Sequence, residues 1–262
     1  MRHPLDGLAR DPAREAQLAH HYPGGSIYAF ERAPSTMDIA HQLAADDAPE
    51  GTLVVATQQE QGRGRLGRRW ESPEGGIYCS LLVRPQRPPK EIPQLSLIAG
   101  LGVAEAIQQA SGLSASIRWP NDVLIRDCKV AGILVESRNG AAVIGVGVNV
   151  STTPDQLSEQ ATSLAVLGAP AIDPDQLAGR LCQRIRAWYD VWHAQGFAPI
   201  RDALRPHIQM FGHMVRLTTD QRAIENTIEG QAVDVDEAGR LVVRLDSGLL
   251  RAFDMGEVTL LR

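Results

Sequence analysis

The 262-residue sequence contains few cysteines and few aromatic side chains, and it lacks any long hydrophobic run. Its three cysteines, Cys79, Cys128 and Cys182, are widely spaced, which excludes a disulfide framework and a cysteine-based zinc site. No apolar run approaches the roughly 18 residues that a bilayer span requires. The first residues also lack the hydrophobic centre of a signal peptide. These absences predict a protein of the reducing cytoplasm with no membrane partner.

An excess of positive charge is also missing. The formal net charge is −5, from 26 lysines and arginines against 31 aspartates and glutamates. A protein that binds nucleic acid non-specifically relies on many phosphate contacts, so this composition argues against that class. Any site rich in positive charge must therefore be confined to a short part of the chain.

The hydrophobic pattern predicts an α+β region followed by a small all-β region. Residues 1–25 form a helical lead-in, residues 26–212 a larger unit of helices and strands, and residues 213–262 short alternating strands typical of a small barrel. Helices are expected from Ser35, with Asp38 as the acidic partner of an N-cap, over residues 95–110, and from Asp173 to Gly196. Strands are expected at 52–57, 77–83, 117–119, 123–125, 130–135 and 143–149, with a hairpin turn at Asn139-Gly140.

A glycine- and arginine-rich stretch lies between the first two of these strands. Residues 62–70 read GRGRLGRRW, with four arginines within seven residues. Glycine permits close approach to a ligand, arginine forks suit carboxylate and phosphate oxygens, and Trp70 offers a flat surface for a ring. Two interpretations stay open at this point: a loop that closes on a nucleotide or another anion, and a solvated basic loop that contacts RNA. The spacing matches neither a phosphate-binding P-loop nor a dinucleotide fingerprint.

A second polar stretch, Arg118-Trp-Pro-Asn-Asp122, is followed by residues 129–136, KVAGILVE. Lys129 supplies a point charge for a phosphate, and a neighbouring aspartate suits hydrated Mg²⁺. Gly132 would let a ligand lie against the strand. Without the arginine-rich stretch, a polar hairpin turn with a surface lysine would be the preferred interpretation of this pattern.

Taken together, these residues resemble the bacterial biotin protein ligase family. Five elements occur in the family's order and cover the chain from about residue 26 to its end: Ser35-Thr36-Met37, Gln59 with GRGRLGRRW, RWPND at 118–122, KVAGILVES at 129–137 and GVGVN at 145–149. The family's fold is a mixed sheet similar to that of class II aminoacyl-tRNA synthetases, followed by an SH3-like barrel.

The resemblance implies an ATP-dependent ligase that acts in two steps. Biotin and ATP first give biotinyl-5′-AMP and pyrophosphate, with Mg²⁺ on the phosphates. A lysine of a biotin carboxyl carrier protein, part of an acetyl-CoA or pyruvate carboxylase, then receives the biotinyl group. The chain is similar to the short type without the DNA-binding domain, so no DNA partner is expected. The oligomeric state is left open between monomer and homodimer.

The resemblance also implies roles for individual residues. It assigns catalysis to four residues, Arg63, Arg65, Lys129 and Asp122, with Asp122 as the candidate ligand of Mg²⁺. The biotin site would comprise Ser35, Thr36, Gln59, Arg63, Gly64, Arg65, Lys129, Gly132 and Leu134. The ATP and adenylate site would comprise Arg65, Arg68, Trp70, Asn121, Lys129 and Asn149, with Trp70 against the adenine.

Two positions depart from the family's common pattern. Met37 stands where asparagine is frequent, and Arg118 where lysine is frequent. Two other hypotheses remain as alternatives. One is a lipoate or octanoate ligase or transferase of the same fold, and the other is a non-catalytic nucleic-acid-binding module.

Overall fold

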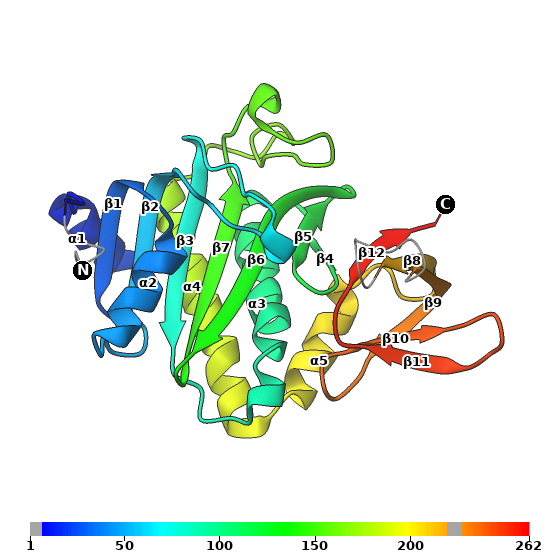
Figure 1. Ribbon diagram of the computed structural model, residues 1–262. Coiled ribbons are helices and arrows are strands. Elements are labelled where there is room, and N and C mark those ends of the chain that lie inside the picture. Colours follow the sequence, from blue (N-terminus) through cyan, green and yellow to red (C-terminus); the bar gives the residue numbers. More distant parts are fainter. Residues whose placement is uncertain (1–6, 219–226, 262) are drawn as a thin grey trace.

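A computed structural model describes residues 7–218 and 227–261 of the chain. Within these residues a large mixed sheet of seven strands adjoins a smaller sheet of five (Figure 1). In the large sheet β1 and β2 are parallel, and every other neighbouring pair is antiparallel. Its strand order is β1 (Ile27–Ala33), β2 (Leu53–Gln59), β3 (Gly76–Val83), β7 (Ala141–Asn149), β6 (Cys128–Arg138), β5 (Asp122–Ile125) and β4 (Ser116–Arg118).

Helices cover both faces of the large sheet. Helix α2 (Thr36–Ala45) lies on one face, while α3 (Gln94–Ser111) and α4 (Pro174–Gln195) pack together on the other (Figure 1). Helix α1 (Pro12–His21) packs against α4 and β1, and the short α5 (Ala198–Leu204) follows α4. The α+β prediction is therefore confirmed. No helix in the described part of the chain is long and apolar enough to cross a membrane.

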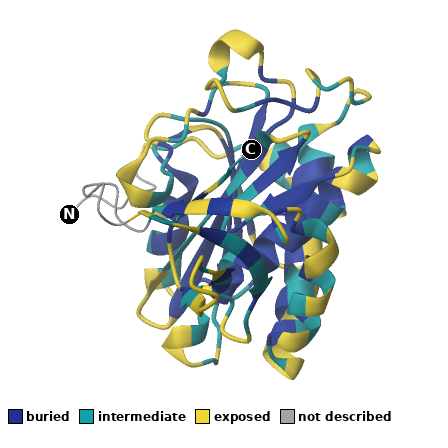
Figure 2. Ribbon diagram, turned by 90° about the vertical axis from the view of Figure 1, so that its right-hand side faces the viewer, coloured by how far each residue is buried: buried dark blue, intermediate teal, exposed yellow. Residues whose placement is uncertain are grey.

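Each face of the sheet has its own apolar core. Along β2, Leu53 and Val55 belong to the core beneath α3 and α4, whereas Val54 and Ala56 belong to the core beneath α2. This alternation follows from the two-residue period of a strand. Buried residues gather in the interior between the layers, and exposed ones lie on the outer sides of helices and in loops (Figure 2).

Most of the predicted element ends are confirmed. Asp173 caps α4 by accepting hydrogen bonds from two backbone N–H groups, and Gly112 ends α3 in the left-handed conformation. Asn139 and Gly140 both have positive φ and join β6 to β7 as the predicted hairpin. The predicted cap at Ser35 is wrong in part: Ser35 precedes α2, but its side chain makes no capping hydrogen bond.

One strand and one α-helix of the larger unit, β1 and α5, were not predicted. In β1 the charged pair Glu31-Arg32 interrupts the apolar alternation, so the strand gives a weak sequence signal. The lead-in predicted for residues 1–25 contains α1, whose helix ends at His21.

The smaller sheet forms the C-terminal barrel. Its strand order is β11 (Leu250–Phe253), β10 (Leu241–Arg244), β9 (Thr227–Val235), β8 (Met214–Thr218) and β12 (Glu257–Leu260). Trp119 Nε1 donates a 3.1 Å hydrogen bond to the carbonyl of Gly239, and Gln94 Nε2 a 3.2 Å bond to that of Glu237. Because the apolar core of the α3 and α4 face continues into the barrel, the two sheets pack as neighbours.

Candidate functional site

A cavity of about 340 Å³ lies on the α2 face of the large sheet. Over β1 to β3 this face is filled by apolar side chains, but β6 and β7 present glycines to it. Gly132 on β6 is directly paired with Gly147 on β7, and Gly145 lies two residues before Gly147. The missing side chains leave room above the strands, and the cavity occupies that room.

The indole of Trp70 lies on this glycine floor. A Cβ atom added to Gly147 would meet the indole at 2.5 Å, and one added to Gly132 at 2.8 Å. The ammonium of Lys129 lies 5.3 Å from the centre of the Trp70 ring. The predicted close approach at Gly132 is thus made by a side chain of the protein itself. At Gly145 the thioether of Met37 takes the corresponding space.

One end of the cavity is polar and uncharged. Gln59 Oε1 accepts hydrogen bonds from the backbone N–H and the hydroxyl of Thr36, at 2.9 and 3.1 Å. Ser80 in turn donates to the Thr36 hydroxyl at 2.8 Å, and Gln59 Nε2 donates to Ser72 at 3.0 Å. These bonds fix the orientation of the side-chain amide of Gln59, which lies beside the first turn of α2.

The other end is charged. Lys129 Nζ lies 2.6 Å from Asp122 Oδ1, and Asn121 donates a 3.1 Å hydrogen bond to the same carboxylate. Arg65 donates to Asn121 Oδ1 at 2.7 Å. Burial lowers the pKa of the Arg65 guanidinium, and the nearby Asp122 and Glu257 carboxylates oppose that shift. Two cations and one carboxylate therefore meet at this end, with Asp122 just behind the cavity wall.

The arginine-rich stretch forms a loop that closes on itself beside the cavity. Gly64 N–H donates to the carbonyl of Arg68 at 2.7 Å, and Trp70 N–H to that of Gly62 at 2.9 Å. On its outer side the loop reaches the barrel, where Arg68 forms an ion pair with Glu257. The loop thus lies between the large sheet and the barrel.

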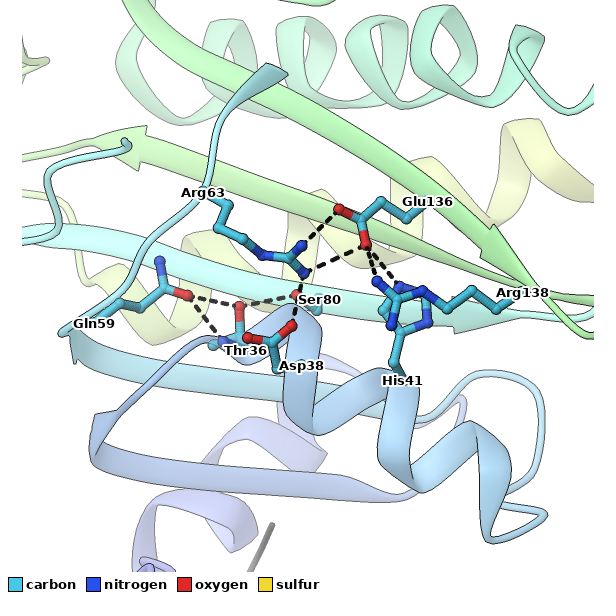
Figure 3. A network of polar contacts seen from close by, with 8 residues as sticks. All are labelled: Thr36, Asp38, His41, Gln59, Arg63, Ser80, Glu136 and Arg138. Atoms are coloured by element: carbon cyan, nitrogen blue, oxygen red, sulfur yellow. Dashed lines mark hydrogen bonds and ion pairs between the residues drawn. The ribbon is translucent and has the colours of Figure 1, made fainter. Parts of the chain in front are cut away.

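Arg63, on the inner side of that loop, reaches two carboxylates (Figure 3). Its terminal nitrogens lie 2.8 Å from Glu136 Oε1 and 2.7 Å from Asp38 Oδ1. His41 and Arg138 both contact the second oxygen of Glu136 at 3.1 Å. The assignment of Arg63 to the substrate anions stays a prediction, because its terminal nitrogens already contact protein carboxylates.

Buried polar atoms without a partner are concentrated in this cavity. Among the residues that the structure describes, five such side-chain atoms occur, and four belong to residues that line the cavity. They are Ser35 Oγ, Arg63 Nε, Trp70 Nε1 and Thr152 Oγ1. Buried polar groups are nearly always hydrogen-bonded, so these atoms indicate a site for a polar ligand.

The structure brings nearly all of the predicted site residues to one place. Asp122 contacts Lys129 from outside the cavity wall, and the remaining predicted residues line the cavity. These are Ser35, Thr36, Gln59, Arg63, Gly64, Arg65, Arg68, Trp70, Asn121, Lys129, Gly132, Leu134 and Asn149.

The loop after β7 also lines the cavity, and the sequence did not predict it. Asn149 is buried, and its side-chain amide donates to the carbonyl of Thr162 at 3.1 Å. The backbone N–H of Lys129 donates to Gln160 of the same loop. The loop's lining residues belong to no motif: Thr152, Gln156, Leu157, Ser158 and Ala161.

The predicted Mg²⁺ site was tested against the donor set. In the described ranges no group of three or more histidine, cysteine, aspartate or glutamate side chains could hold a metal ion. At the charged end Asp122 is the carboxylate in contact with Lys129, whereas Glu257 is paired with Arg68. One carboxylate together with ligand phosphates is a usual arrangement for Mg²⁺, so the residues fit an ion that arrives with a nucleotide.

Two family models and several relatives match the sequence. Residues 29–152 match the Biotin/lipoate A/B protein ligase family, and residues 211–261 match the Biotin protein ligase C terminal domain. The chain is 36% identical to the bifunctional ligase/repressor BirA of Bacillus subtilis over 229 residues, which cover 84% of this chain and 69% of that protein. It is 35% identical to the biotin–[acetyl-CoA-carboxylase] ligase of Paracoccus denitrificans over 207 residues, covering 74% of this chain and 85% of that one.

Structural comparison gives the same result. The biotin protein ligase of Aquifex aeolicus in complex with biotin and ATP superimposes with a TM-score of 0.76 and 29% identity, covering 90% of this chain and 98% of that one. The two chains therefore share their overall architecture over most of their length. The chain therefore belongs to the biotin protein ligase family.

Proposed function

We propose that this cavity activates biotin with ATP and holds biotinyl-5′-AMP until the biotinyl group passes to a lysine of a biotin carrier protein. The chain is an ATP-dependent biotin ligase by family, and its relatives include biotin–[acetyl-CoA-carboxylase] ligases. The observation that carries the residue assignments is the cluster of unpartnered buried polar atoms in this one cavity. Biotin supplies matching groups, because its ureido ring has one carbonyl acceptor and two N–H donors.

In the first step a biotin carboxylate oxygen bonds to the α-phosphorus of ATP, and the bond to pyrophosphate breaks. Both reactants are anions, so their charge must be neutralised before they can come together. We assign this to Lys129 and Arg65, with Arg68 near the phosphates. Mg²⁺ bound with the nucleotide, with Asp122 as its candidate protein ligand, would supply further positive charge. Lys129 would exchange its contact with Asp122 for a phosphate oxygen.

The uncharged end of the cavity suits the ureido ring. Ser35 Oγ is buried and free to hydrogen-bond, while Thr36 and Gln59 are already oriented by their mutual hydrogen bonds. We place the ring against these three side chains and the backbone at Gly132 and Leu134. The carboxylate would then point along the glycine floor toward Lys129, with the nucleotide near Trp70, Asn121 and Asn149.

In the second step the amine of the acceptor lysine attacks the carbonyl carbon of the mixed anhydride. The bond to AMP breaks, and the amine loses a proton. The mixed anhydride hydrolyses readily, so water must be excluded until the acceptor arrives. The loop at residues 62–70 covers the site and is the candidate for that closure. We propose a biotin carboxyl carrier protein as acceptor, a cytoplasmic location and no DNA partner.

Mass spectrometry tests the proposal directly. The purified chain is incubated with Mg²⁺-ATP and either biotin or lipoate, and its mass is then measured under non-denaturing conditions. We expect a bound mass equal to biotinyl-5′-AMP with biotin alone. A lipoyl adenylate instead would keep the fold and overturn the substrate, whereas no adenylate with either acid would overturn the proposed function.

A further inference from the structure

The loop at residues 62–70 separates two cavities. The cavity described above, the inner cavity, is one of them. The second, of about 670 Å³, lies between the loop, the start of α3, the end of β6 and the barrel; we call it the outer cavity. Arg63, Arg65 and Arg68 line both cavities. The loop therefore forms a wall between the two cavities.

The inner side of this wall is fastened at Arg63. Its two terminal nitrogens make three contacts with carboxylates, two of them with Glu136 on β6 and one with Asp38 in the first turn of α2. The family resemblance assigns no role to these acidic residues, although Glu136 lies within the element KVAGILVES, and neither one lines the inner cavity. Glu136 lies on a strand and Asp38 on a helix, so both offer fixed points to the loop. The backbone of the loop itself makes few hydrogen bonds to its surroundings.

Glu136 is the stronger of the two fixed points. Its side chain is 24% exposed, whereas that of Asp38 is 48% exposed and therefore more strongly screened by water. Glu136 is itself oriented by His41 and Arg138, which both contact its second carboxylate oxygen (Figure 3). Gln59 accepts a hydrogen bond from the backbone N–H of Thr36, and Thr36 lies in the first turn of α2 together with Asp38. The biotin end of the cavity and the loop anchor thus share one helical turn.

We propose that Glu136 and Asp38 are positioning residues of this ligase: by holding Arg63 they keep the loop closed as the wall between the cavities and so retain the activated intermediate. Retention of the intermediate rests on the proposed function, whereas the hold of the two carboxylates on Arg63 does not. Neither carboxylate is assigned a contact with biotin, ATP or the reacting atoms.

The first test measures the loop without any ligand. Hydrogen exchange of the backbone amides of residues 62–70 is compared between the wild-type chain and Glu136→Gln, which keeps the side-chain size. We expect exchange about tenfold faster in the variant, since hydrogen bonds between charged groups contribute more than neutral ones. Asp38→Asn, at a half-exposed position, should show a smaller increase. Glu105→Gln is the matched control, because Glu105 on α3 is similarly exposed, at 22%, and pairs with Arg184 on α4 rather than with the loop.

The second test measures retention of the intermediate. Biotinyl-5′-AMP is formed on the enzyme without acceptor, and its release is followed by labelling of added bystander lysines. We expect release about tenfold faster in Glu136→Gln, by the same free-energy difference, and within about twofold of wild type in Glu105→Gln. The rate of adenylate formation should change less than the rate of release, because no group that touches the reactants has been altered.

A double-mutant cycle separates an anchor from direct action on the substrate. If Arg63 acts through Glu136, then Arg63→Met with Glu136→Gln will release the intermediate no faster than Arg63→Met alone. Additive effects would overturn the proposal, since Arg63 would then act on the ligand. Unchanged exchange in a folded Glu136→Gln would overturn the anchor whatever the reaction. A wild-type chain that forms no biotinyl-5′-AMP would refute the proposed function, while the exchange result would still decide the anchor.

Discussion

The two faces of the large sheet differ in what covers β6 and β7. On the α3 and α4 face these strands present Ile133, Ile144, Val146 and Val148, all packed into a continuous core. On the α2 face the alternate positions include Gly132, Gly145 and Gly147, and the cavity lies above these glycines. The same strands therefore stabilise the fold through one set of positions and form the site through the other. Substitutions can test this division because the two sets alternate along one strand.

The largest effect is expected at Lys129, at the charged end of the α2 face. Lys129→Ala should lower the rate of adenylate formation by roughly a thousandfold, because it removes a fixed positive charge that meets the reacting phosphate. The free energy of unfolding should fall by no more than about 1 kcal/mol, as is usual for a partly exposed ion pair. Single-turnover pyrophosphate release and urea unfolding measure the two quantities. Near-normal turnover would contradict the assignment of Lys129 to the phosphate.

The opposite result is expected on the other face of β7. Ile144 is fully buried beneath α3 and α4, so Ile144→Ala should lower the free energy of unfolding by about 2–5 kcal/mol through lost packing and a residual cavity. Biotin affinity should stay within about twofold of wild type, because the lost atoms lie on the far side of the strand. Chemical denaturation and calorimetric titration test both parts. A large loss of affinity in a folded variant would show that the two faces are not independent.

Three residues along the same strand, Gly147 provides the counterpart. Gly147→Val places atoms where the Trp70 indole now lies, so the indole must move off the glycine floor. Because the displaced indole then fills part of the cavity, we expect a loss of biotin affinity of roughly 30-fold, which corresponds to about 2 kcal/mol of binding free energy. The free energy of unfolding should change less than in Ile144→Ala. Affinity equal to that of the wild type would mean that the floor is not part of the biotin site.

The smallest effect concerns His41, at the edge of the α2 face. Burial lowers the pKa of His41 below its ordinary value of 6.5; Arg138 and Arg63 act in the same direction, and Glu136 opposes them. Below about pH 6.5 the unfolded chain therefore binds more protons than the folded one, and the free energy of unfolding should decrease as the pH falls. His41→Gln should make this decrease shallower. An identical pH profile in the variant would show that His41 does not contribute to the pH dependence of the free energy of unfolding.

Much of the fold could be predicted because local signals and tertiary structure agree. The cap at Asp173, the left-handed Gly112 and the Asn139-Gly140 turn each act over a few residues. The site residues could be named through the resemblance to a family rather than through local signals, and the structure brings them to one cavity.

The contacts that organise the site could not be predicted in the same way. Arg63 and Glu136 are 73 residues apart, and no local pattern favours that pairing over another. The hydrogen bond from Asn149 to the loop after β7 likewise depends on tertiary packing, and that loop gives no motif. At Ser35 a tertiary contact prevailed over a local one, because Asp38, the expected partner in the cap, instead contacts Arg63.

The position of Trp70 on the glycine floor gives the molecule an optical reporter. Of the four tryptophans, Trp70 is the one that lines the inner cavity, whereas Trp119 and Trp192 are buried in the apolar core. A ligand that enters the cavity changes the polarity around this indole and leaves the other three in place. Tryptophan emission therefore follows occupancy of the site without any attached label. The Trp70→Phe variant is the control, because its emission should not respond to the ligand.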